Sequence, residues 1–218
     1  PIAHALIEAF GSLYGVFQAT EEELYSINGM TQNAACFIAD FLPISRKIQC
    51  SCFASQKYVS RLSDAVNVLR PYFYGRNSEF IYCLALDLND RLLQICKISD
   101  GEADSVVINN NKILALVTRT KAKKIILAHN HPAGNIKPSD SDLQSTRMLN
   151  VLLAGVNARL SDHIIFSGDE YFSFYESDLL ACFSDDNSHY ANEQRRKKRS
   201  EGIYMEDEKP SEETLGEE

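Results

Sequence analysis

The sequence predicts an α/β fold, in which a mixed β-sheet carries flanking helices. Short apolar runs such as 80–86 and 125–128 predict buried strands. Between them lie longer segments in which apolar residues recur at helical spacing, as in 143–153. With 218 residues, 44% of them hydrophobic, the chain can bury a sizeable core. This alternation of strands and helices predicts helices packed on a sheet.

The first part of the chain, residues 1 to 44, is predicted to form a small helical segment. Apolar residues recur three or four positions apart in three stretches, 6–10, 24–27 and 34–41. Residues 45 to 56 are polar and predict a connector. Ser63 is expected to cap the next helix, which runs towards Tyr74.

The central region is predicted to alternate strands and helices from residue 80 onwards. Residues 80–88 and 91–98 predict a hairpin around Asn89-Asp90. The later elements are, in order, a helix with Ile113, Leu114, Leu116 and Val117, the strand at 125–128, a helix that opens at Ser139, and a hairpin of 163–167 with 171–175 turning at Gly168-Asp169.

Two histidines, His129 and His131, follow the apolar strand directly. Residues i and i+2 of a strand point to one face, so both imidazoles can be directed to a single point. Pro132 ends the strand, and after a tight loop Asp142 falls in the first turn of the next helix. Two histidines and a carboxylate are the three-ligand set of a catalytic zinc, whose fourth position is left for water.

A structural interpretation of these residues stays open beside the metal site. Ser139 and Asp142 stand three apart, as in a variant of the capping box that begins a helix. Paired strand histidines are often only packed and hydrogen-bonded. Other catalytic patterns do not compete, since the sequence has no His-Glu-x-x-His, no deaminase cysteine pair, no nucleophile elbow and no Walker loop.

The stretch His129-Asn130-His131-Pro132-Ala133-Gly134, with Pro138-Ser139 and Asp142, resembles the JAMM (MPN/JAB) metalloprotease motif in its bacterial RadC form. The resemblance continues through Thr146-Arg147, 162–165 and 171–174. It covers about residues 57 to 183, which we take as one JAMM/MPN domain, and weakly residues 5 to 45. It implies a three-layer architecture like that of cytidine deaminases.

The resemblance also implies a function, that of a zinc-dependent hydrolase which cleaves a peptide or isopeptide bond in a protein or peptide substrate. One zinc ion would be held by His129, His131 and Asp142. JAMM enzymes use an upstream glutamate as general base, and Glu79 matches it by position, just before the strand at 80. Glu102 is the fallback for that role. Ser139 is expected to donate a hydrogen bond to the developing oxyanion.

The resemblance to RadC proteins also implies a second function, that of a non-catalytic accessory or DNA-binding protein in DNA repair. RadC proteins carry a helix-hairpin-helix-like module there, which holds DNA through glycine-rich turns. In this chain Gly29 matches one such glycine, whereas Thr31 stands where a second is expected and disfavours a positive φ. Residues 1–42 hold five acids and no lysine or arginine, which disfavours DNA as a partner.

Other features of the sequence limit the remaining possibilities. His163 is interpreted as a packed histidine or as support for a ligand rather than as a ligand itself. The six cysteines show no disulfide framework, and Cys50 and Cys52 lack a second pair for a metal, so we expect a cytoplasmic protein. No apolar run is long enough to span a membrane. The charged tail, residues 185–218, is expected to be disordered.

Overall fold

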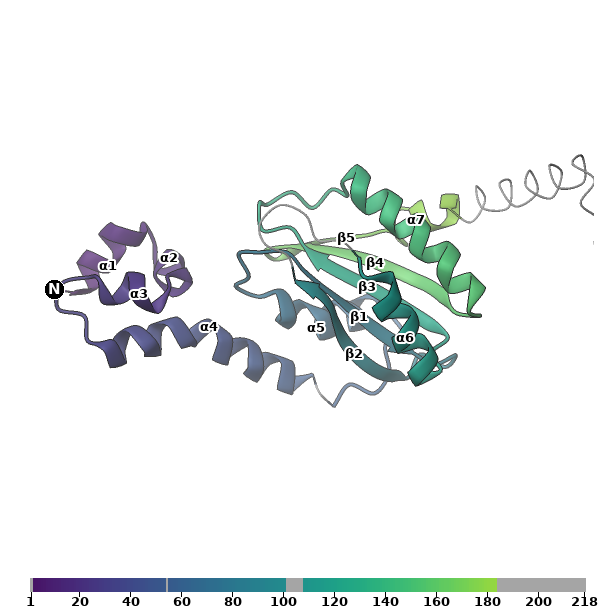
Figure 1. Cartoon of the computed structure of the whole chain (residues 1–218), viewed down its shortest axis with the longest axis horizontal. Helices are drawn as coiled ribbons and strands as arrows, with labels where there is room; N and C mark the ends of the chain where they lie inside the picture. The colour runs from purple at the N-terminus through teal and green to yellow at the C-terminus, as the bar shows by residue number, and fades with distance from the viewer. Residues whose placement is uncertain (1, 54, 101–107, 184–218) are drawn as a thin grey trace, which may run out of the picture. The chain divides into compact units, whose positions relative to one another are not determined.

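The computed structural model describes residues 2–53, 55–100 and 108–183 (Figure 1). Its contacts divide the chain into two compact units, Pro1–Leu180 and Ala181–Glu218, and only residues 181–183 of the second are described. The elements are α1 (Ile2–Phe10), α2 (Leu13–Gln18), α3 (Glu21–Tyr25), α4 (Gln32–Cys52), α5 (Leu62–Phe73), β1 (Phe80–Leu86), β2 (Leu92–Asp100), α6 (Asn110–Thr120), β3 (Lys124–Asn130), α7 (Asp140–Gly155), β4 (Arg159–Ser167) and β5 (Glu170–Ser173).

Hydroxyl side chains cap helices α2, α3 and α4 of the N-terminal segment. Ser12 accepts a hydrogen bond from the Gly15 amide, and Thr20 forms a full capping box with Glu23. Thr31 caps α4 with a φ of −92°, so it does not adopt the left-handed conformation that glycine takes in a DNA-binding turn. The helices of this segment pack around a small apolar core, which consists of Leu6, Val16, Ala19, Leu24, Met30 and Ala35.

Helix α4 shows that the predicted polar connector over residues 45–56 was wrong in its greater part. The helix continues to Cys52, through Pro43, although an interior proline removes one backbone hydrogen bond. The next helix, α5, is capped at Arg61 rather than at Ser63, because Asp64 accepts hydrogen bonds from the Ser60 and Arg61 amides. The division into domains at residue 44 stays a prediction.

The predicted mixed sheet is confirmed, and among the described residues it has five strands in the order β2-β1-β3-β4-β5. Of these five described strands, β3 and β4 are parallel, and the other neighbours are antiparallel. Both predicted hairpins are present, between β1 and β2 and between β4 and β5. In the register of β1 and β3, Ile81 pairs with His129, which fixes where the histidines leave the sheet.

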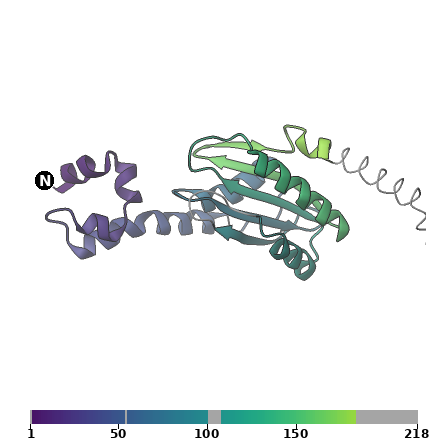
Figure 2. The ribbon, with the colours of Figure 1, turned by 45° about the horizontal axis from the view of Figure 1, so that its top comes forward.

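Helices cover both faces of the sheet, so the domain has three layers (Figures 1 and 2). Helix α5 packs on one face, where Val68, Leu69 and Phe73 meet β-strand residues such as Leu84 and Phe166. Helices α6 and α7 lie on the other face, and their buried residues include Ile113, Leu116, Leu149 and Leu153. His129 therefore lies on a strand that is buried along its whole length, and His131 follows directly after that strand.

Two expectations fall on parts of the chain that are not described. Glu102, the fallback general base, lies outside the described residues. The tail from 185 to 218, expected to be disordered, lies outside them as well. Among the residues that are described, no helix combines the length and the apolar character needed to cross a membrane.

Candidate metal centre

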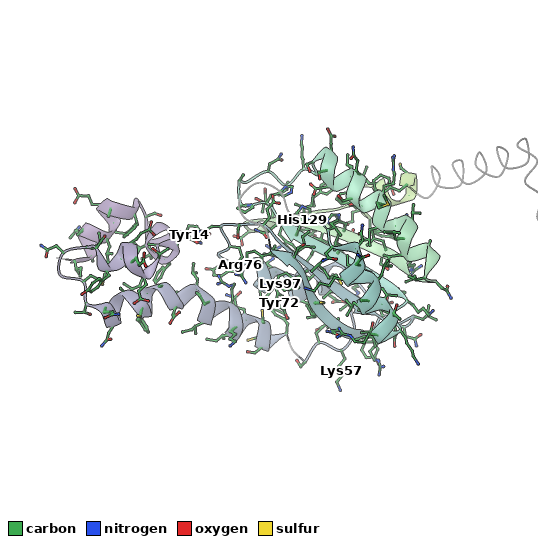
Figure 3. The ribbon with its side chains drawn as sticks, in the orientation of Figure 1. Tyr14, Lys57, Tyr72, Arg76, Lys97 and His129 are labelled. Atoms are coloured by element: carbon green, nitrogen blue, oxygen red, sulfur yellow. The ribbon has the colours of Figure 1, made fainter. Side chains whose placement is uncertain are left out.

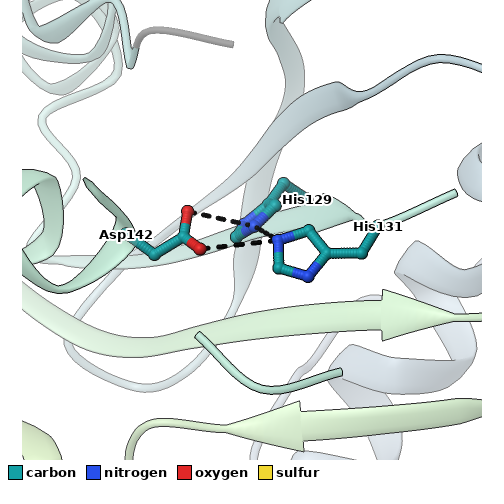
Figure 4. Close-up of side chains that lie close together, drawn as sticks. All are labelled: His129, His131 and Asp142. Carbon is teal, nitrogen blue, oxygen red and sulfur yellow. Dashed lines mark hydrogen bonds and ion pairs between the residues drawn. The ribbon is translucent and has the colours of Figure 1, made fainter. Parts of the chain in front are cut away.

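His129, His131 and Asp142 meet at one point at the end of β3, on the side of the sheet that α7 covers (Figures 3 and 4). Nε2 of His129 lies 3.3 Å from Oδ1 of Asp142, and Nε2 of His131 lies 3.4 Å from Oδ2. The two imidazole nitrogens are 2.8 Å apart. Within the described residues this is the group of three side chains whose donor atoms could hold a metal ion.

These separations suit a small tetrahedral ion. Ligand atoms at zinc distances lie about 3.3 to 3.6 Å apart in a tetrahedron. Each histidine nitrogen lies at such a distance from one carboxylate oxygen, His129 from Oδ1 and His131 from Oδ2. The two histidine nitrogens are closer, at a hydrogen-bond distance, and would have to separate by about half an ångström around an ion. Two imidazoles and one carboxylate are a donor set that zinc and other divalent transition metals accept. The ion's identity does not follow from it.

Asp142 has the capping role, and its position also suits the metal site that the sequence left open beside it. Its Oδ2 accepts hydrogen bonds from the amide and the hydroxyl of Ser139, at 2.8 and 2.7 Å, and its own amide donates back to the hydroxyl oxygen. This is a complete capping box at the beginning of α7. The same carboxylate faces both histidines, so the cap fixes the orientation of a candidate ligand.

The side chain of His163 contacts His129 at the ring nitrogen that does not face His131 and Asp142. It is fully buried on β4, and its ring stacks on Phe174 with centroids 4.7 Å apart. Nε2 of His163 lies 2.8 Å from Nδ1 of His129, and its Nδ1 lies 2.7 Å from the hydroxyl of Thr146. His163 thus touches a candidate ligand without joining the cluster, as the sequence predicted.

The hydroxyl of Thr146 determines where the protons lie in this chain of contacts. It donates to the backbone carbonyl of Asp142, so towards His163 it can only accept. Neutral His163 therefore carries its proton on Nδ1 and accepts at Nε2 from Nδ1–H of His129. This leaves an unprotonated Nε2 on His129, which is the atom that faces His131 and Asp142.

Burial and hydrogen bonding set the charges of the three residues. Burial lowers the pKa of His129 to about 4, against the attraction of Asp142, so this ring is neutral. The hydrogen bond with Asp142 raises the pKa of His131, whose other nitrogen lies 2.6 Å from the Asn135 carbonyl. Burial alone would raise the pKa of Asp142. Its hydrogen bonds with His131 and Ser139 lower this pKa, and so does the electrostatic effect of His129. The carboxylate is ionised and ready to bind a cation.

Glu79 lies immediately before β1, partly buried. It is not in the cluster of three, but its charge contributes to the raised pKa of His131. Ser139 is used as a cap, with its proton directed to Asp142. The catalytic roles of both residues therefore stay predictions.

Two supporting residues had no predicted role. Thr146 belongs to the stretch that resembles the family, and it stands four positions after Asp142, the helical spacing at which a hydroxyl reaches a backbone carbonyl. Asn130 lies between the two histidines and binds the backbone beside Glu79. No local pattern indicates that contact, because it joins two strands 50 residues apart.

The domain has three α/β layers, and two histidines and a helix aspartate meet at one end of its sheet. This arrangement defines a class of protein, the JAB-type domains. The family model described as the RadC-like JAB domain matches residues 59–179. The chain belongs to the family of RadC-like JAB domain proteins.

Bacterial proteins similar to this chain extend the comparison beyond the JAB domain. A UPF0758 protein of Acinetobacter baumannii is 31% identical over 180 residues, which are 82% of this chain and 77% of the relative. A UPF0758 protein of Fusobacterium nucleatum is 30% identical over 83% of this chain and 81% of its own length. One from Coprothermobacter proteolyticus is 29% identical, over 82% and 78%. These names state no reaction, so the activity has to be argued from the site.

Proposed function

We propose that the chain is a zinc-dependent hydrolase of the JAMM type, which cleaves a peptide or isopeptide bond in a protein or peptide substrate. The convergence of His129, His131 and Asp142, with an unprotonated nitrogen of His129 facing the other two, carries this proposal. It is supported by membership of the RadC-like JAB family. A bound zinc ion would supply an acidified water and a Lewis acid for the scissile carbonyl.

Each side chain has a defined task in this proposal. His129 and Asp142 offer a neutral nitrogen and an ionised carboxylate, while His131 releases its proton when it becomes a ligand. Glu79, whose charge acts on His131, takes a proton on its carboxylate from the attacking water and delivers it to the leaving amine. Ser139 orients Asp142 and adds a hydroxyl at the edge of the site.

The proposed setting of the enzyme is the cytoplasm. All six cysteines are free thiols, which fits a reducing compartment. We also propose that residues 57–183 act as the catalytic domain and residues 1–44 as a separate interaction module. The acidic charge of residues 1–42 supports a protein partner for that module rather than DNA.

The test is cleavage of a peptide library by the zinc-loaded chain, run with linear peptides and with lysine-branched isopeptides. We expect Glu79→Gln to bind zinc normally and to lose at least about 100-fold in turnover, because a general base contributes that much. Glu170→Gln, an exposed acid on β5, is the matched control and should cleave like the wild type. Full activity in Glu79→Gln would show that this glutamate is not the general base. A zinc-loaded chain that cleaves neither linear peptides nor isopeptides would contradict the proposal.

A further inference from the structure

Asn130 binds the chain on both sides of Glu79. It is 5% exposed, and it stands between the two candidate ligands on β3. Its side-chain oxygen accepts a hydrogen bond from the Phe80 amide at 2.9 Å, and its side-chain nitrogen donates to the Ser78 carbonyl at 3.0 Å. Both ends of one carboxamide are thus used on the two residues that flank the proposed general base.

The strand register explains what these bonds achieve. The backbone ladder between β1 and β3 ends where Ile81 pairs with His129, and directly paired residues share a face of the sheet. Glu79 stands two residues before Ile81, and His131 stands two residues after His129. The Asn130 side chain continues the ladder past its last backbone pair, and this extension keeps Glu79 at the level of His131.

We propose that Asn130 is a positioning residue, which holds Glu79 in reach of a water bound between the candidate ligands. The proposal rests on the function proposed above, in which Glu79 is the general base. Without the carboxamide, Ser78 and Phe80 lose their bonds to β3, and the segment that carries Glu79 is no longer fixed on that side. A displacement of about 1 Å at such a site can reduce turnover about 100-fold.

The first test is a double-mutant cycle on the peptide substrates that the wild type cleaves. We expect Asn130→Ala to bind zinc at the same stoichiometry and to lose about 10- to 100-fold in kcat with little change in KM. Combined with Glu79→Gln it should cause no further loss, because Asn130 acts through Glu79. Additive losses in the double variant would overturn the proposal, as would an unchanged kcat in Asn130→Ala.

A second readout needs no substrate, so it separates this proposal from the hydrolase itself. In the cobalt-substituted protein the visible spectrum follows ionisation at the metal site with pH. Glu79→Gln removes a nearby negative charge. It should therefore lower the pH at the midpoint of this spectral change by about half a unit. Asn130→Ala, or Asn130→Leu if alanine disturbs folding, should shift it in the same direction, with no further shift in the double variant.

The control is Asn109→Ala, which removes a comparable bond from an asparagine oxygen to the Lys112 amide at the beginning of α6. We expect the wild-type midpoint for this control. A wild-type midpoint in Asn130→Ala overturns the positioning role even if the hydrolase is real. A shifted midpoint in a chain that cleaves no peptide supports positioning while the hydrolase fails, and a chain that binds no cobalt overturns both.

Discussion

Nδ1 of His129 lies 2.8 Å from Nε2 of His163, and this bond decides which nitrogen of His129 faces the candidate metal site. His163 can accept there because its other nitrogen donates to Thr146, whose own proton is used on the Asp142 carbonyl. This series of hydrogen bonds begins at His129 and ends at Asp142, and both are candidate ligands. His129 is therefore neutral and correctly oriented before any ion binds.

Removal of this support should weaken metal binding. His163→Ala and Thr146→Val are each expected to reduce zinc affinity about 10- to 100-fold, because partners that orient a ligating histidine have effects of this size. Competition with a chelating dye measures the dissociation constant. Thr120→Val is the matched control, since Thr120 bonds the Leu116 carbonyl in the same way, on α6, away from the site. Wild-type affinity in both His163→Ala and Thr146→Val would show that His129 is oriented without them.

Zinc affinity should depend on pH through His131. Its pKa is raised in the metal-free protein, chiefly by the hydrogen bond with Asp142, and a proton must leave before the nitrogen can bind an ion. Below this raised pKa we expect affinity to fall about tenfold per pH unit, with one proton released per zinc. Above it the dependence should flatten. Calorimetry in buffers of different ionisation enthalpy counts the protons, and a count of zero at pH 6 would contradict the assignment.

The same histidine should affect the stability of the metal-free protein with the opposite trend. A histidine whose pKa is raised by folding stabilises the folded state fully below its unfolded pKa. That contribution is lost as the pH rises through the raised folded value. We therefore expect His131→Ala to be destabilised relative to the wild type near pH 5 and less so near pH 9, as measured by urea unfolding. An equal difference at both pH values would show that this ring gains no proton affinity on folding.

Ser139→Ala should affect both stability and metal binding, because Ser139 caps α7 and holds Asp142. Loss of a helix cap costs about 1 kcal/mol in the free energy of unfolding. Loss of the bond to Oδ2 should also weaken zinc about tenfold. Thr31→Ala, which removes the cap of α4, should show a similar loss of stability with unchanged zinc affinity. If both variants bind zinc alike, the serine does not orient the carboxylate.

The N-terminal segment should give no DNA affinity. Residues 1–42 carry five acids and no lysine or arginine, while nonspecific DNA binding depends on cations at the phosphates. Fluorescence anisotropy with a duplex between 50 and 200 mM salt, on the full chain and on a chain without residues 1–44, separates this segment from the rest. A salt-dependent affinity that disappears with the deletion would favour the DNA-binding alternative.

The fold was predictable because its elements have strong local patterns. Residues 125–128 are apolar and lead directly to His129 and His131, and the strand period of two directs both rings to one face. The cluster therefore followed from β3 and the first turn of α7. The capping interpretation of Asp142 is confirmed, and the same carboxylate faces both histidines, as the predicted metal site requires.

The rest depended on tertiary contacts that leave little local signal. Helix α4 continues through Pro43, where the polar residues after it predicted a connector, so the length of this helix was underestimated. The bonds of Asn130 to Ser78 and of His163 to His129 join positions 52 and 34 residues apart. Such contacts depend on strand order and register, which the sequence pattern alone did not give.

Zinc stoichiometry of the purified chain tests the central claim most directly. After removal of metal with a chelator, exposure to zinc and desalting, plasma mass spectrometry should find one zinc per wild-type chain. His129→Ala and Asp142→Ala should each retain less than about a tenth of that amount, because two remaining ligands do not hold the ion through desalting. One zinc per chain in both variants, or none in the wild type, would contradict a metal centre built from His129, His131 and Asp142.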